Sequence, residues 1–126
     1  FNVRHENFIE KICEYAYAVD QYFGNRALYV NFALNITPDC DCWPANDVPI
    51  VQDAGILASF NPLALDRATL DKVNACKPNP SSIHAVKIKN QKNIFMETKP
   101  DLPSDYIFEY CSTMGMSDAY ELKIVE

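Results

Sequence analysis

Two cysteines separated by a single residue are the most distinctive chemical feature of the sequence. Cys40 and Cys42 lie in the segment DCDCW at 39–43, between Pro38 and Pro44. Thiolates are good ligands for zinc, copper and iron–sulfur clusters. The two prolines exclude regular helix and favour a turn that would bring both sulfur atoms to the same side. A tetrahedral site needs four ligands, so this pair would supply only part of a metal site.

Carboxylates stand next to both thiols. Asp39 and Asp41 disfavour a free thiolate electrostatically, which argues against a reactive nucleophilic cysteine, and a bound cation would reverse this penalty. We therefore assign Asp39 and Asp41, with Cys40 and Cys42, to one candidate metal-binding loop. The alternative is two small thiols in a turn with local hydrogen bonds from the aspartates.

Two further aspartates are candidates for acid–base catalysis. Asp53 precedes a predicted strand and could instead cap amides of its own loop. Asp66 falls between Leu70 and Val73 on the apolar side of a predicted helix, so its carboxylate must be paired or have a changed pKa. The alternative is that this side faces solvent or another part of the protein. The two histidines lie in no catalytic or metal-binding motif.

The residues before this loop predict a helix over 5–23 and a strand over 27–34. The apolar stripe of the helix recurs at steps of three and four residues and comprises Phe8, Ile12, Ala16, Val19 and Phe23. Gly24 favours a helix end. The strand is almost entirely apolar, which predicts burial on both faces and requires a hydrogen-bond partner for Asn31.

The residues after the loop predict a βα unit followed by less regular structure. A short strand over 54–59 is followed by Asn61-Pro62, a helix N-cap and first position, and by a helix over about 62–75. Residues 77–93 are ambiguous between an edge strand and a short helix. A further helix is predicted over 103–114 and a final strand over 120–125. Together, these predicted strands and helices indicate one α/β domain over residues 1–126, with a small mixed sheet flanked by about three helices.

The composition argues for a globular domain and against several classes of protein. The 126 residues are 48 % hydrophobic, enough for one core, and the net charge of −6 disfavours binding to nucleic acids or anionic membranes. No apolar run approaches the ~20 residues that span a bilayer. Five cysteines are an odd number, which argues against a disulfide framework and favours a reducing cytoplasm.

A resemblance to a known family supplements these predictions. The run NFALNITPDCDCWPANDVPIVQDAGILASFNPLALDRATLDKVN at 31–74 closely resembles the uncharacterised iron–sulfur-centre proteins, a family of unknown function that often carries a ferredoxin-type four-iron module. Residues 5–30 and the ending MGMSDAYELKIVE at 114–126 resemble it as well, whereas 77–100 do so weakly. Phe60-Asn61-Pro62 departs from the expected charged residue followed by Asp-Pro, and the asparagine preserves the cap.

The resemblance implies that this chain is the C-terminal portion of a longer protein, in keeping with its start at Phe1. The cluster-binding cysteine motifs would lie upstream, so we expect no standard cluster in this portion alone. A metal ion or iron–sulfur cluster would belong to the full-length protein, and the partner would be its N-terminal remainder with the ferredoxin-type module.

Three hypotheses remain open at this point. The first is a metal- or iron–sulfur-associated module of a redox protein, in which Cys40 and Cys42 supply part of a site that the N-terminal remainder completes. The second is a non-catalytic scaffold that docks through the 35–50 loop. The third is an enzyme that uses Asp53 and Asp66 as acid and base.

Overall fold

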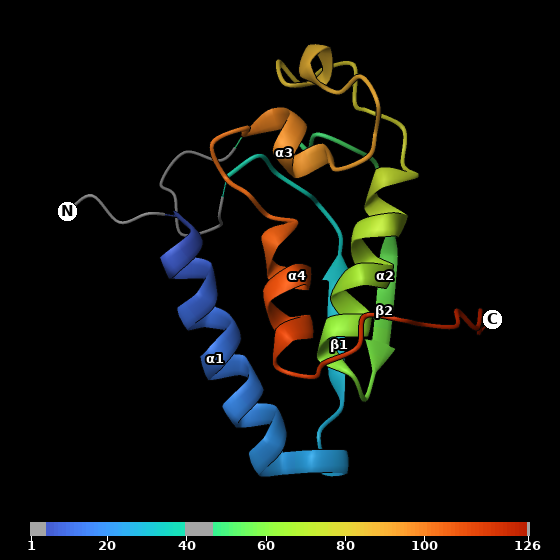
Figure 1. The fold of residues 1–126 in the computed structure, drawn as a ribbon. Coiled ribbons are helices and arrows are strands. Elements are labelled where there is room, and N and C mark those ends of the chain that lie inside the picture. Colours follow the sequence, from blue (N-terminus) through green and yellow to red (C-terminus); the bar gives the residue numbers. More distant parts are fainter. Residues whose placement is uncertain (1–4, 40–46, 126) are drawn as a thin grey trace.

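A computed structural model describes residues 5–39 and 47–125 of the chain, and it confirms a small α/β fold (Figure 1). Its regular elements, in chain order, are α1 (His5–Phe23), β1 (Tyr29–Ala33), β2 (Gly55–Ser59), α2 (Pro62–Asn74), α3 (Ile94–Thr98) and α4 (Tyr106–Thr113). Two 3-10 turns, η1 (Gly24–Arg26) and η2 (Ala85–Lys87), join some of them. Among the described residues, no helix is both long and apolar enough to cross a membrane.

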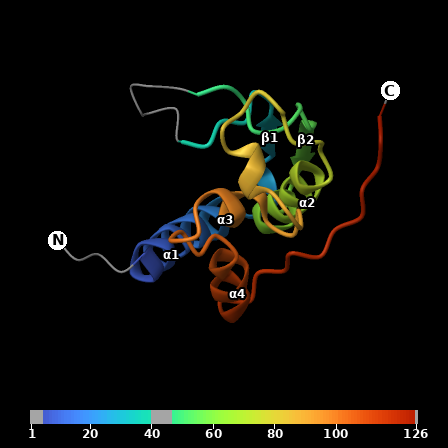
Figure 2. The ribbon, with the colours of Figure 1, turned by 90° about the horizontal axis from the view of Figure 1, so that it is seen from above.

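The two strands form an antiparallel ribbon whose register runs from Tyr29 opposite Ser59 to Ala33 opposite Gly55. Helix α2 packs against both strands and covers one face of the ribbon (Figure 2). This helix begins where the sequence predicts, because the Asn61 side chain accepts a hydrogen bond from the N–H of Ala64 at 3.1 Å. The segment from 55 to 74 is thus the predicted βα unit.

Two hydrophobic clusters hold the elements together. The first joins α1, α2 and α4, and its buried members are Ile9, Cys13, Leu63, Leu70, Phe108 and Cys111. The second lies between the ribbon, α2 and α3, and its buried members are Ala33, Ile50, Val51, Val73 and Ile94. Ile50 and Val51 come from the segment between β1 and β2, so the end of that connection is part of the core.

The predicted helix over 5–23 is confirmed, but the side of it that is buried differs from its apolar stripe. Ile9 and Cys13 are the buried residues of α1, whereas Phe8 and Ile12 are 56 % and 45 % exposed. The reason is that α1 packs against α4 through the neighbouring side, where Glu10 meets the hydroxyl of Tyr106. The more apolar side of the helix is left without a partner among the described residues.

The prediction that β1 is buried on both faces is also wrong. Its exposure alternates along the strand, and Phe32 on the side away from α2 is 67 % exposed. In β2, Ile56 lies opposite Phe32 and is 60 % exposed. We call the uncovered side of the ribbon, formed by Val30, Phe32, Ile56 and Ala58, the outer face. The side chains of the outer face are all apolar, and no described element covers them.

The C-terminal half contains three differences from the sequence prediction. Residues 120–125 are extended but unpaired, so the described sheet has two strands and not the mixed arrangement expected. Helix α4 begins at Tyr106 because residues 99–105 turn, as in the bond from the N–H of Leu102 to the carbonyl of Lys99. Helix α3 was not predicted. Within 77–93, the ambiguous Ile83–Ile88 stretch contains the single turn η2.

Candidate functional site

The connection between β1 and β2 carries the candidate metal ligands, and both of its ends are fixed. The N–H of Ile50 donates to the carbonyl of Ile36 at 2.8 Å, and the N–H of Ala54 donates to that of Ala33 at 2.8 Å. Ile50 is fully buried in the second hydrophobic cluster. Cys40, Asp41 and Cys42 lie outside the described residues, so their assignment as metal ligands stays a prediction. The two ends of this connection form a hydrogen-bonded base, which suits a functional loop.

Asp53 belongs to this base. Its carboxylate accepts a hydrogen bond from the backbone N–H of Asn35 at 2.7 Å. Asn35 has a φ of 50°, a left-handed conformation that asparagine tolerates better than most residues. The geometry therefore gives Asp53 the local capping role that the sequence analysis named as its alternative.

Asp39 lies at the end of the described part of the loop and is paired with a cation. Its carboxylate forms an ion pair with the ammonium group of Lys99, which follows α3. Its carbonyl accepts from the hydroxyl of Thr37 at 2.9 Å. A metal ion at Asp39 would compete with Lys99. The sequence carried no signal for this lysine, since it lies 60 residues further along the chain.

Two of the described cysteines are part of the core. Cys13 and Cys111 are 1 % and 4 % exposed and face each other between α1 and α4. Burial, followed by the hydrogen bond with Cys13, raises the pKa of the Cys111 thiol to about 12. Burial likewise raises the pKa of Cys13. A metal ion would have to enter the core and displace these protons before either thiol could bind it.

Cys76 is the remaining described cysteine, and it also lies apart from the loop. Its thiol donates to the carbonyl of Lys72 at 3.3 Å, at the end of α2. Within residues 5–39 and 47–125, no three His, Cys, Asp or Glu side chains are grouped so that they could hold a metal ion. A metal centre would thus depend on Cys40 and Cys42 together with ligands from elsewhere.

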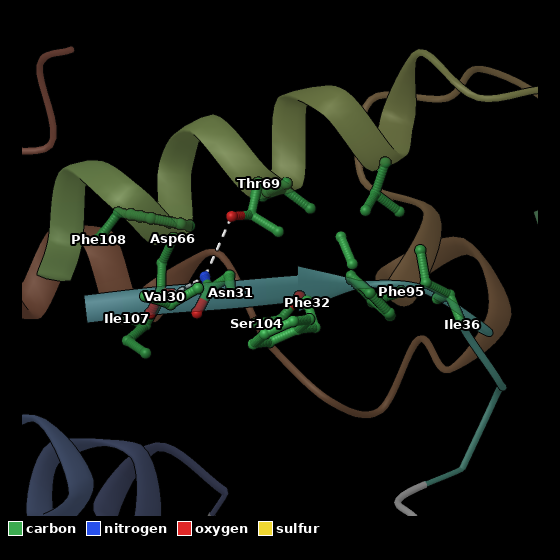
Figure 3. Close-up of a pocket in the computed structure, with 13 residues that line it drawn as sticks. Val30, Asn31, Phe32, Ile36, Asp66, Thr69, Phe95, Ser104, Ile107 and Phe108 are labelled. Atoms are coloured by element: carbon green, nitrogen blue, oxygen red, sulfur yellow. Dashed lines mark hydrogen bonds between the residues drawn. The ribbon is translucent and has the colours of Figure 1, made fainter. Parts of the chain in front are cut away.

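The second candidate region is a groove beside β1, shown in Figure 3. Its volume is about 470 Å³, and it is lined by residues 30–33 of β1, one side of α2, and side chains of α3 and α4. We call this space the β1 groove. Its walls are mostly apolar, as in many binding sites.

Polar groups of the β1 groove gather where Asp66 faces the strand. The amide of Asn31 donates to the Asp66 carboxylate at 2.9 Å and to the Thr69 hydroxyl at 3.0 Å (Figure 3). Asn31 is a polar residue in an apolar strand, and Asp66 lies on the apolar side of a helix. Each therefore provides a hydrogen-bond partner for the other. Their separation of 35 residues explains why the sequence did not reveal the pair.

The structure does not bring Asp53 and Asp66 into one site. Asp66 lines the β1 groove, whereas Asp53 lines a separate cavity with Pro49 and Asn79. Acid–base catalysis by this pair would need both carboxylates at one substrate. Their catalytic roles remain sequence-based predictions without a shared cavity.

The described residues form a small α/β fold in which the ends of the connection between β1 and β2 are joined by backbone hydrogen bonds. Residues 1–71, more than half of the chain, match the model of the family described as Domain of unknown function (DUF362). The chain belongs to this family. Comparison with curated proteins gives no significant match, and comparison with solved structures gives none either.

Proposed function

We propose that this domain is a metal- or iron–sulfur-associated module of a redox protein, and that its Cys-x-Cys loop contributes two thiolates to a centre completed elsewhere in the protein. The observation that carries the proposal is the hydrogen-bonded base of the loop. Backbone bonds from Ile50 to Ile36 and from Ala54 to Ala33 close it, and the core residue Ile50 anchors it. Such a base would present Cys40 and Cys42 in a fixed place.

The burial of two other cysteines supports the same assignment. Cys13 and Cys111 are packed in the core with 1 % and 4 % exposure, so they are not presented to a metal at the surface. Cys40 and Cys42 provide two of the four ligands that a tetrahedral zinc or a four-iron cluster requires. The rest would come from the N-terminal remainder of the protein, with its ferredoxin-type module. A reducing cytoplasm would keep the two thiols available.

Metal analysis of the full-length protein tests the proposal. Replacing both Cys40→Ser and Cys42→Ser should lower the bound metal relative to the wild type, because serine is a poor ligand for soft metals. Cys76→Ser is the matched control, since this thiol lies at the end of α2 and bonds only to a local carbonyl. Equal metal content in the wild type and the double variant would contradict the proposal.

A docking role without metal is the second candidate, and the outer face favours it. Phe32 and Ile56 are exposed side by side next to the base of the loop. Exposed apolar areas of this kind mark contacts with other protein surfaces. Here the occupant would be the N-terminal remainder of the same protein. Phe32→Glu would then break the contact between the two parts of the protein, whereas Cys40→Ser and Cys42→Ser would leave this contact intact. This difference distinguishes the second candidate from the first.

A further inference from the structure

Strand β1 has one edge without a partner. The carbonyl of Ala33 accepts from Ala54, which turns the backbone groups of Ala33 toward β2. Successive residues of a strand direct their N–H and C=O groups to opposite edges, so Val30 and Phe32 present theirs to the other edge. No strand pairs with that edge within the part of the chain that the structure describes. An open edge of this kind is a template for another strand.

The β1 groove runs along this open edge. One wall is β1 itself, the opposite wall includes Ile107 and Phe108 of α4, and α2 contributes Asp66 and Thr69. Asp66 is exposed, and its carboxylate accepts a hydrogen bond from the neutral amide of Asn31. The groove thus offers backbone hydrogen bonds, apolar walls and one carboxylate. This combination suits an extended peptide segment with apolar side chains and one basic group.

The C-terminal segment of the chain has that composition. Its apolar residues Tyr120, Leu122 and Ile124 alternate with Glu121, Lys123 and Val125. The segment is extended and has no partner strand among the described residues, and Ile124 and Val125 are 80 % and 92 % exposed. Lys123 is its basic residue. An alternating, exposed and unpaired segment is a strand that lacks a sheet.

The start of this segment is tied to the outer side of α2, away from the groove of the same chain. Arg67 bonds to Asp118 at 2.9 Å, and the hydroxyl of Tyr120 donates to Asp71 at 2.7 Å. Beyond Tyr120 the chain runs away from the body on the β2 side, whereas the open edge belongs to β1 (Figures 1 and 2). The segment is therefore placed to reach another molecule.

We propose that the β1 groove receives the C-terminal segment of a second copy of the chain, as a strand parallel to β1. In a parallel arrangement with Lys123 beside Asn31, the ammonium group meets the Asp66 carboxylate. Leu122 and Ile124 of the segment then continue the outer face. An antiparallel arrangement with the same charge pair would place Glu121 beside the buried Ala33, which is unfavourable for a carboxylate.

The far end of the groove supports the same direction. Val125 of the parallel segment would lie beside Ala33, where the groove is lined by Ile36, Val73 and Phe95. Reciprocal exchange gives a symmetric dimer in which each copy donates one strand and accepts one. This inference does not depend on the proposed metal centre, since it involves neither Cys40 nor Cys42.

Sedimentation velocity of the full chain tests the proposal. The wild type should be a dimer, and removal of residues 122–126 should give a monomer. The truncation keeps the bonds of Asp118 and Tyr120 to α2, so the fold should be retained, as circular dichroism would verify. A wild type that is monomeric, or a truncated chain that remains dimeric, would overturn the proposal.

A charge exchange tests the contact between the segment and the groove. Lys123→Asp should weaken the dimer by about tenfold or more, the effect of placing like charges at a contact. Lys92→Asp is the matched control, because Lys92 is exposed in the loop before α3, and it should leave the dimer unchanged. Adding Asp66→Lys to Lys123→Asp should restore dimerisation. Equal weakening by both lysine variants, or no restoration, would overturn the assigned contact.

Discussion

The α1–α4 interface and the outer face of the ribbon both contain apolar side chains but differ in how far these are covered. At the interface Phe108 is 5 % exposed, and the hydroxyls of Tyr106 and Tyr110 donate to Glu10 and Glu14. On the outer face Phe32 is 67 % exposed. The difference teaches that an apolar pattern shows which residues favour burial, whereas the arrangement of elements decides which of them are covered.

A matched pair of phenylalanines gives the largest expected difference between the two regions. Phe108→Ala should lower the free energy of unfolding by about 3–5 kcal/mol, because it leaves a cavity and removes the ring under the Arg67 guanidinium, 3.6 Å from its centroid. Phe32→Ala should cost less than about 1 kcal/mol, since its ring is mostly in water. Urea denaturation measures both, and equal losses would contradict the comparison.

A buried polar residue should have the next largest effect. Asn93 is 4 % exposed, donates to Ser104 and Asp105, and accepts from the N–H of Met96. Asn93→Ala leaves these groups unpaired and should cost about 1–3 kcal/mol in the free energy of unfolding. Asn90→Ala, in the exposed loop before α3, is the control and should be nearly neutral. A neutral Asn93→Ala would show that water replaces its bonds.

Alkaline pH should lower the free energy of unfolding through groups at the α1–α4 interface. Cys111 has its pKa raised from 9.0 to about 12 in the folded state, so folding holds its proton more tightly. The corresponding stability is complete below pH 9 and is lost as the pH rises toward 12, by at most about 1.4 kcal/mol per pH unit for one group. Tyr106, whose donation to Glu10 raises its pKa to about 12, contributes in the same direction.

Urea denaturation at a series of pH values, with Cys111→Ala as the comparison, isolates the thiol. The variant should lose less stability between pH 9 and 12 than the wild type does. Alkylation at pH 8 provides an independent measure, since Cys13 and Cys111 should react far more slowly than in the unfolded chain. Fast labelling of these two cysteines in the folded protein would contradict the closed interface.

The ion pair at the base of the loop should have the smallest effect. Lys99 and Asp39 have side chains 40 % and 39 % exposed, so solvent screens their attraction. Lys99→Ala should cost about 0.2–1 kcal/mol in the free energy of unfolding, and less at high salt. Lys92→Ala is the control. A loss of several kcal/mol would mean that the loop base, like the α1–α4 interface, is a stabilising contact.

Local signals in the sequence account for most of the fold. Helix α1 and the N-cap of α2 at Asn61 follow from periodicity and capping, and the two strands lie within two residues of their predicted ends. Helix α3 escaped prediction because a helix of five residues shows little periodicity. The strand over 120–125 has the right alternation, but a strand also needs a neighbour, and alternation cannot supply one.

The candidate site was less accessible to sequence reasoning than the fold. The loop was recognised from its own residues, Cys40 and Cys42. The partners Lys99 of Asp39 and Asn31 of Asp66 are distant in the chain, and only tertiary structure brings them together. The prediction that the nearly apolar strand over 27–34 is buried on both faces is wrong because the sequence of a strand does not show which elements cover each face.

The closed base of the β1–β2 connection has a consequence for variation in this family. Since the bonds from Ile50 to Ile36 and from Asn35 to Asp53 already join the two ends, we expect insertions between Ile36 and Ile50 to have little cost to folding. Doubling such a loop costs only about 0.6 kcal/mol of closure entropy. Relatives could therefore diversify the chemistry carried by this segment while inheriting the same scaffold.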